Sequence, residues 1–176
     1  MREPSEPTER WLNFLALTTV VFAVCATLST LKGGGYSTRS VVSQAEASNQ
    51  WAHFQSKSIK GYLYDLQRDK LELELKAGVA DGGGAYQAKI ALYAAESVRY
   101  RDERTAIAAA ATTLEQARDQ ARRQSGSFGL AAMFLQIAIL LSSIAALTKR
   151  RLFWYLGNAA GCFGLLYFFD GFFVFM

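Results

Sequence analysis

Three stretches of the chain carry no charged residue, and each is long enough to cross a lipid bilayer as a helix. They cover residues 11–31, 124–148 and 152–169, which are 21, 25 and 18 residues long. About 20 apolar residues in helical form cross a hydrocarbon core roughly 30 Å thick. A helix buried in a soluble protein rarely stays uncharged over such a length. The pattern therefore predicts three transmembrane helices, at 11–31, 127–148 and 152–174, after an N-terminal tail at 1–10.

The first apolar stretch has a second interpretation, because Arg2 and Arg10 precede it as basic residues precede the core of a signal peptide. The apolar core of a signal peptide usually has about 7–15 residues, and this stretch is longer. We therefore expect an uncleaved membrane anchor.

Between the first and second apolar stretches the chain becomes polar. Residues 32–126 hold 14 Lys or Arg and 11 Asp or Glu, and no proline. Glycine triplets at 33–35 and 82–84 and the sequence SGSFG at 125–129 suggest interruptions. We expect two long helices between these breaks, at about 39–76 and 85–125.

Both expected helices show spacings of three and four residues, which are typical of a coiled-coil seam. In the second helix the seam positions are Tyr86, Ile90, Tyr93, Ser97, Tyr100, Arg104, Ile107, Ala111, Leu114, Arg118 and Ala121. In the first they are Ala45, Ser48, Ala52, Gln55, Ile59, Tyr62, Leu66, Asp69 and Leu73. Two such helices joined by a short glycine-rich turn fold back as an antiparallel hairpin.

The expected fold is thus an all-α membrane protein with three transmembrane helices and a long antiparallel hairpin inserted between the first and the second. Two helices alone hide few apolar groups from water, and hairpins from several copies would hide more. We therefore expect a homo-oligomer in a lipid bilayer.

A cluster of three cations, Lys149, Arg150 and Arg151, joins the last two apolar stretches. Short loops rich in Lys and Arg stay in the cytoplasm, whereas a long domain crosses the membrane largely regardless of its charge. The basic loop therefore predicts that residues 149–151 lie in the cytoplasm and that residues 32–126 lie in the periplasm. Lys32, Arg39, Arg122 and Arg123 flank the other membrane face and argue for the reverse.

Three separated motifs carry a resemblance to a known family. They are WLNFLALTTVVFAVCATLSTLKGGGYSTRSV at the first apolar stretch, ASNQWAHFQSKSIK at 47–60, and LLSSIAALTKRRLFWYLG near the basic loop. Together they resemble the bacterial membrane-protein family catalogued as domain of unknown function 4337. The resemblance implies a bacterial membrane protein and brings no activity with it. From the three spans and the expected orientation, we expect a multi-pass protein of the bacterial inner membrane.

Small residues mark candidate packing faces in the last two spans, because they let helix backbones approach closely. Gly157, Gly161 and Gly164 share one face, and Ala138, Ser142 and Ala146 form a similar face. Contact within the chain and contact between copies are equally open interpretations of these faces.

Two further features are candidate sites. Ser48, Trp51 and Gln55 lie on one helical face with Ser58, where we expect a polar layer in the hairpin or between copies rather than a recognition patch. Asp170 is a candidate intramembrane acid, and such acids often mark ion or proton pathways. It lies 19 residues, or roughly 28 Å of helix, after Arg151. We therefore expect it at the lipid headgroups, with Phe172, Phe173 and Phe175 as an aromatic anchor.

No catalytic signature accompanies these features. The sequence has no nucleophile elbow, no HExxH and no phosphate-binding loop, and His53 is its only histidine. We therefore expect no enzymatic activity, no cofactor and no metal, and the interleaved acids argue against nucleic acid as a partner. The favoured function is a structural or scaffolding homo-oligomer. The alternative is a channel whose pore is lined by residues such as Asn13, Thr18, Thr19, Ser142, Ser143 and Asn158.

Overall fold

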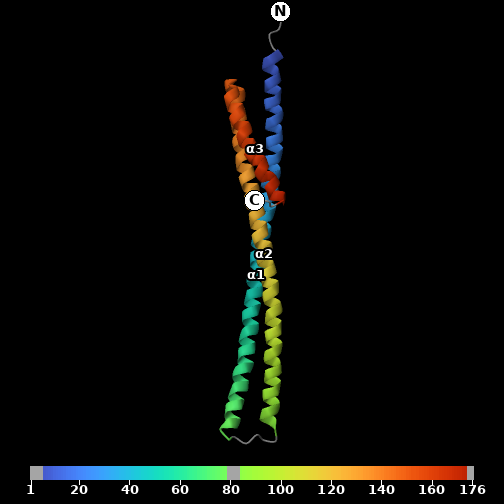
Figure 1. Cartoon of the computed structure of the whole chain (residues 1–176), viewed down its shortest axis with the longest axis vertical. Coiled ribbons are helices and arrows are strands. Elements are labelled where there is room, and N and C mark those ends of the chain that lie inside the picture. Colours follow the sequence, from blue (N-terminus) through green and yellow to red (C-terminus); the bar gives the residue numbers. More distant parts are fainter. Residues whose placement is uncertain (1–5, 79–83, 174–176) are drawn as a thin grey trace, which may run out of the picture. The chain divides into compact units, whose positions relative to one another are not determined.

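A computed structural model describes residues 6–78 and 84–173, which form three helices and no strand (Figure 1). Helix α1 covers Glu6–Lys76, α2 covers Ala85–Thr148 and α3 covers Arg151–Phe173. Each contains a stretch that is long and apolar enough to cross a membrane. The expected all-α class with three such helices is confirmed. The expected anchor residue Phe175 and the expected turn residues Gly82 and Gly83 lie outside the described residues.

Helix α1 begins within the expected tail and then continues without the interruptions that the glycines suggested. It runs through 33–35, and α2 runs through 125–129, so the breaks expected there are wrong. Each helical glycine costs about 1 kcal/mol relative to alanine. Contacts made at Gly33 offset part of this cost. A Cβ atom there would lie 3.2 Å from Cβ of Phe128, and the Ser125 hydroxyl donates to the Gly33 carbonyl at 3.0 Å.

The helices pack as two compact units. Unit 1 contains Met1–Val41 and Arg118–Met176, and unit 2 contains Val42–Ala117. Unit 1 therefore includes all of α3 and the most apolar parts of α1 and α2. Unit 2 holds the remaining, polar parts of α1 and α2.

In unit 1, α3 lies alongside α1 and α2 (Figure 1). One core cluster joins Phe22, Ala26, Leu135 and Ala138, and a second joins Trp11, Leu15 and Ala145. The clusters cover little of the apolar surface. Of the most apolar 18-residue windows of α1, α2 and α3, only 22%, 28% and 17% are buried in the protein.

A tight turn connects α2 and α3. Helix α2 ends at Thr148, Lys149 takes a left-handed φ of 52°, and α3 begins at Arg151. The guanidinium of Arg151 lies 5.9 Å from the ring centroid of Trp11, near enough for a cation–π contact.

In unit 2 the contacts pair successive positions of α1 with positions of α2 in the opposite order. Trp51 contacts Glu115, Lys57 contacts Glu103, and the Ser97 hydroxyl donates to Asp65. The most deeply buried side chains between the helices are small, with Ala47 1% and Ala111 0% exposed. Gly61 leaves room for Tyr100, because a Cβ there would lie 3.5 Å from Cβ of Tyr100.

The two expected seams differ in how far the structure buries them. All eleven seam positions expected in α2, from Tyr86 to Ala121, are buried or half-buried. All nine expected in α1, from Ala45 to Leu73, are exposed. The expected α1 seam does not face α2, so this part of the expectation is wrong. Helix α1 instead packs against α2 with a neighbouring stripe that contains the small residues Ala47, Ser58 and Gly61.

Candidate functional site

The glycines of α3 form a packing face against the other two helices of unit 1. A Cβ atom on Gly161 would collide with the ring of Phe22 on α1. On Gly164 it would lie 2.7 Å from Cγ of Leu135, and on Gly171 2.8 Å from Cε2 of Phe128, both on α2. Of the two interpretations that the small-residue pattern left open, the structure therefore shows contact within the chain at these glycines. The partner of Gly161, Phe22, gave no signal in the sequence.

Gly157 and the small face of α2 meet closely. A Cβ atom on Gly157 would lie 3.1 Å from the carbonyl oxygen of Ala138 and 3.4 Å from Oγ of Ser142. Ala138 and Ser142 are both fully buried. Among the described side chains, the Ser142 hydroxyl is a buried group without a hydrogen-bond partner.

Asp170 of α3 is buried inside unit 1, with 3% of its surface exposed. The Ser127 hydroxyl of α2 donates to its Oδ2 at 2.6 Å. Aromatic rings lie nearby, with the centroids of Phe128 and Phe172 5.1 Å apart. The expected aromatic neighbour Phe173 is 74% exposed. Asp170 is thus a hydrogen-bonded acid between two helices, and its partner Ser127 was not anticipated.

The polar face of residues 47–58 divides in two. The indole Nε1 of Trp51 donates to Oε1 of Glu115 at 3.0 Å, and Ser58 accepts from Arg104 at 3.4 Å. Ser48 and Gln55 remain exposed. Within the hairpin, Trp51 and Ser58 therefore contribute polar contacts to α2, and a polar layer between copies that includes Ser48 and Gln55 stays a prediction.

The exposed stripe of α1 in unit 2 contains large apolar side chains at heptad spacing. Ile59 is 61% exposed, Tyr62 64%, Leu66 63% and Leu73 66%. We call these four residues the apolar α1 face. Leu63, 54% exposed, lies beside it. Exposed apolar patches of this kind usually mark contact sites.

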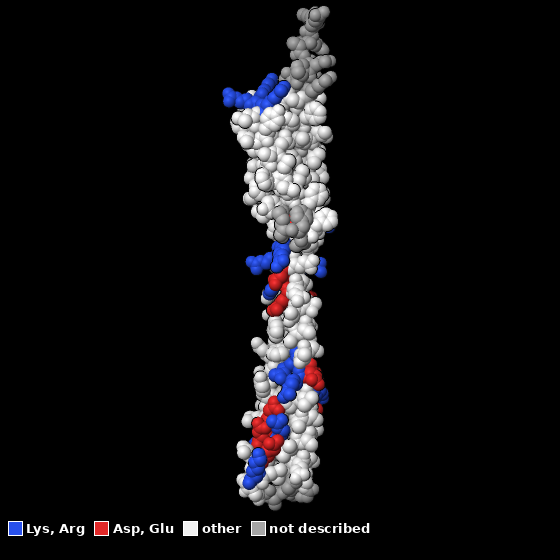
Figure 2. All heavy atoms as spheres, in the orientation of Figure 1, with Lys and Arg blue, Asp and Glu red and all other residues white. Residues whose placement is uncertain are grey.

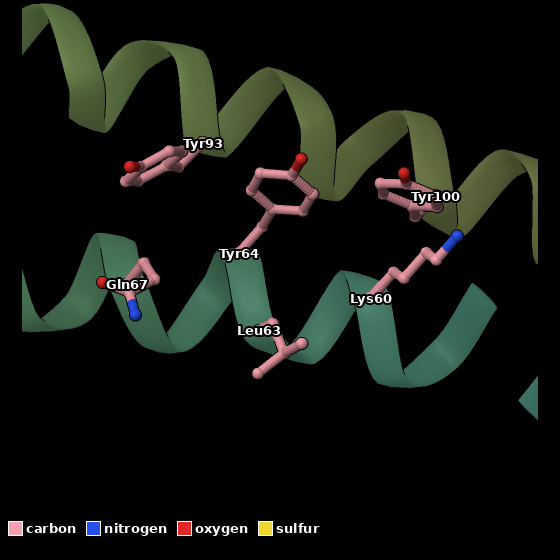
Figure 3. A pocket seen from close by; sticks show the side chains of 6 residues that line it. All are labelled: Lys60, Leu63, Tyr64, Gln67, Tyr93 and Tyr100. Carbon is pink, nitrogen blue, oxygen red and sulfur yellow. The ribbon is translucent and has the colours of Figure 1, made fainter. Parts of the chain in front are cut away.

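Beside this face, tyrosines from both helices line a groove of about 410 Å³ (Figure 3). The Tyr64 ring of α1 lies between the rings of Tyr93 and Tyr100 of α2, at centroid distances of 5.7 Å and 5.6 Å. Lys60, Leu63 and Gln67 complete the lining. The sequence identified Tyr93 and Tyr100 as seam residues but gave no reason to single out Tyr64.

Ion pairs form within and between the two helices at the surface of unit 2. The Lys57 ammonium lies 2.6 Å from Glu103, and Arg99 contacts Glu96 at 2.6 Å. The hydrogen bond from Lys57, helped by the charges of Lys57 and Arg99, holds the pKa of Glu103 below its ordinary value. Among the described residues no group of three His, Cys, Asp or Glu is arranged to hold a metal ion.

The comparisons with known proteins yield one match. The chain belongs to the family described as Domain of unknown function (DUF4337), whose model matches residues 11–174. No curated protein and no solved structure matches the chain.

Proposed function

We propose that the chain is a structural membrane protein that assembles with identical copies. In this proposal three spans anchor it in the inner membrane of a bacterium. Residues 32–126 form an antiparallel hairpin outside the cytoplasm, and the hairpins of neighbouring copies pack together. The observation that carries the assembly is the apolar α1 face, which α2 of the same chain leaves exposed.

Membrane anchoring is supported by the surface of unit 1. Large apolar side chains face outward on all three helices, for example Leu31 at 68%, Leu140 at 64% and Phe163 at 57% exposure. Exposed hydroxyls also bond within their own helices, as Ser143 does to the Ile139 carbonyl at 2.9 Å. This is the arrangement that a helix needs where no water is present.

A second copy is the natural occupant of the apolar α1 face. Copies inserted in one membrane with the same orientation have α1 helices that run in the same direction, so we expect two of these helices to meet in parallel. At heptad spacing, Asp65 and Lys70 then fall at the flanking positions that face each other across a parallel pair. Asp69, the charged position of this stripe, is already paired with Arg68 at 2.8 Å.

Oligomeric state tests the proposal directly. The full-length protein in a mild detergent should have a mass of at least two copies by mass photometry. The double substitution Ile59→Ser with Leu66→Ser should shift the distribution toward one copy, because it removes apolar area at the contact.

A matched control uses the exposed apolar residues of α2. Leu92→Ser with Val98→Ser removes side chains that are 56% and 52% exposed but lie on another helix, so the assembly should persist. A wild-type protein that is monomeric under all mild conditions would remove the support for a scaffold.

Orientation follows from the basic turn, and cysteine labelling tests it. With Cys25 and Cys162 replaced by alanine, a cysteine at position 81 should react with a membrane-impermeant maleimide once the outer membrane is opened. A cysteine in place of Arg150 should react only after the inner membrane is broken. The reverse pattern would place the hairpin in the cytoplasm.

A pore between copies is the competing function, and the described residues favour it less. Thr19 donates to the Leu15 carbonyl at 2.7 Å, and Ser142 is buried against Gly157. These hydroxyls are therefore occupied or covered within one chain. Conductance across a planar bilayer containing the purified protein would reverse the preference.

A further inference from the structure

Charge is distributed unevenly between the polar parts of the chain. Residues 42–117 of unit 2 hold nine Lys or Arg and ten Asp or Glu. Residues 32–41 and 118–126 of unit 1 hold five Lys or Arg and one Asp or Glu. The positive charge of the segment between the first two spans is thus concentrated beside those spans.

Four of these cations, Lys32, Arg39, Arg122 and Arg123, have exposed side chains. We call them the basic collar. Among the described residues none of the four forms an ion pair, whereas four cations of unit 2 do, namely Lys57, Arg68, Lys70 and Arg99. The nearby acid Asp119 is held by Arg118 at 2.8 Å and also feels the charges of Arg122 and Arg123. Because residues 32–41 and 118–126 hold five cations and one acid, the collar keeps a net positive charge.

The collar borders the apolar surface of unit 1. Lys32 directly follows the uncharged residues 11–31, and Arg123 directly precedes the uncharged residues 124–148. The Lys32 ammonium lies 6.0 Å from the ring centroid of Phe172 near the end of α3. Figure 2 shows the uncharged band of unit 1 with cationic side chains at both of its ends.

We propose that the basic collar is a docking surface for the headgroups of anionic phospholipids. This rests on the membrane insertion proposed above, because insertion places the collar at the level of the headgroups. Lys and Arg beside a span are attracted to anionic lipids, and the attraction weakens with salt. Position favours lipid over nucleic acid, since the collar cations lie beside the uncharged stretches, whereas in unit 2 acids balance the cations.

Lipid selectivity in a reconstituted bilayer tests the collar. The full-length protein is placed in phosphatidylcholine bilayers with a trace of spin-labelled phosphatidylglycerol or spin-labelled phosphatidylcholine. Electron spin resonance then gives the fraction of each lipid immobilised by the protein. At low salt the protein should prefer phosphatidylglycerol. The variant Lys32→Gln, Arg39→Gln, Arg122→Gln, Arg123→Gln should lose at least about fivefold in selectivity, because each cation near an anionic surface contributes a factor of about five and the variant removes four.

A control variant makes the same change of charge elsewhere. Lys60→Gln, Lys76→Gln, Lys89→Gln, Arg101→Gln neutralises four exposed cations of unit 2 and should leave the selectivity unchanged. The basic turn at 149–151 is intact in both variants, so its contribution is constant. Equal selectivity in the wild type and the collar variant would overturn the proposal. Absence of immobilised lipid of either kind would instead contradict membrane insertion, and the collar proposal with it.

Discussion

Gly161 of α3 lies directly against the ring of Phe22 of α1, and this ring occupies the space that a methyl group on Gly161 would need. The contact joins the third helix to the first, while Gly164 and Gly171 join it to the second. The absence of side chains at these positions sets how closely the three helices of unit 1 approach. Gly34 and Gly129 in the same unit have no such neighbour within 4 Å, and this difference leads to a prediction.

Gly161→Ala and Gly164→Ala should each destabilise the protein by about 1–3 kcal/mol, the usual cost of overpacking a filled core. Gly34→Ala and Gly129→Ala should stabilise it by up to about 1 kcal/mol each, because alanine is the better helix former and no atom lies within 4 Å of the added methyl group. Unfolding in mixed detergent micelles, followed by circular dichroism, measures both pairs. The same sign for all four variants would contradict the packing described here.

The hydrogen bond from Ser127 to Asp170 should contribute to the stability of unit 1. Ser127→Ala should cost about 1 kcal/mol. Asp170→Ala should cost about 1–3 kcal/mol, because it leaves the Ser127 hydroxyl only the longer contact with the Arg123 carbonyl, at 3.3 Å. Asp170→Asn keeps an acceptor oxygen and should cost less than Asp170→Ala. The same unfolding measurement ranks the three variants, and an Asp170→Ala variant as stable as the wild type would show that the bond is unimportant.

The stability of unit 2 should fall in acid partly through Glu103. Because its pKa is lowered in the folded protein, chiefly by the hydrogen bond from Lys57, the folded state gains stability above the ordinary glutamate pKa. That gain is lost as the pH falls through the lowered folded value. Glu103→Gln should therefore flatten the acid side of a thermal melting profile recorded between about pH 5 and pH 2.

Glu46→Gln serves as the control for this titration. Glu46 is exposed and forms no ion pair with a described residue, so its replacement should leave the acid side of the profile in place. Equal profiles for the wild type and Glu103→Gln would show that the Lys57 pair does not contribute. Added salt should reduce the difference, since the pair lies at the surface.

The sequence was most informative where one property of a residue decides its environment. Long uncharged stretches indicated three apolar helices, and the structure has them. The face of Gly157, Gly161 and Gly164 was recognisable because small residues permit close approach. Its partner Phe22 was not recognisable, because a large apolar residue in an apolar helix suits lipid and protein equally.

The α1 seam shows a different limit. Heptad spacing selected Ile59, Tyr62, Leu66 and Leu73 because they are apolar, but the stripe that meets α2 contains Ala47, Ser58 and Gly61. Small residues on α1 leave room for bulky residues of α2 such as Tyr100. The stability gained by this packing depends on which side chains α2 places opposite them. Spacing identifies an apolar face without stating which molecule covers it. The glycine triplet at 33–35 was likewise expected to interrupt a helix. The helix continues there, and the contact of Gly33 with Phe128 that accompanies it cannot be seen in the sequence.

Disulfide trapping at the apolar α1 face tests the central claim, that this face joins identical copies. In a protein with Cys25 and Cys162 replaced by alanine, a cysteine at Leu66 should form a disulfide-linked dimer in native membranes under mild oxidation. A cysteine at Ala109, which is exposed on α2, should form little. Efficient dimer formation at position 66 alone is the predicted result. No dimer at position 66, or equal trapping at both positions, would contradict assembly through this face.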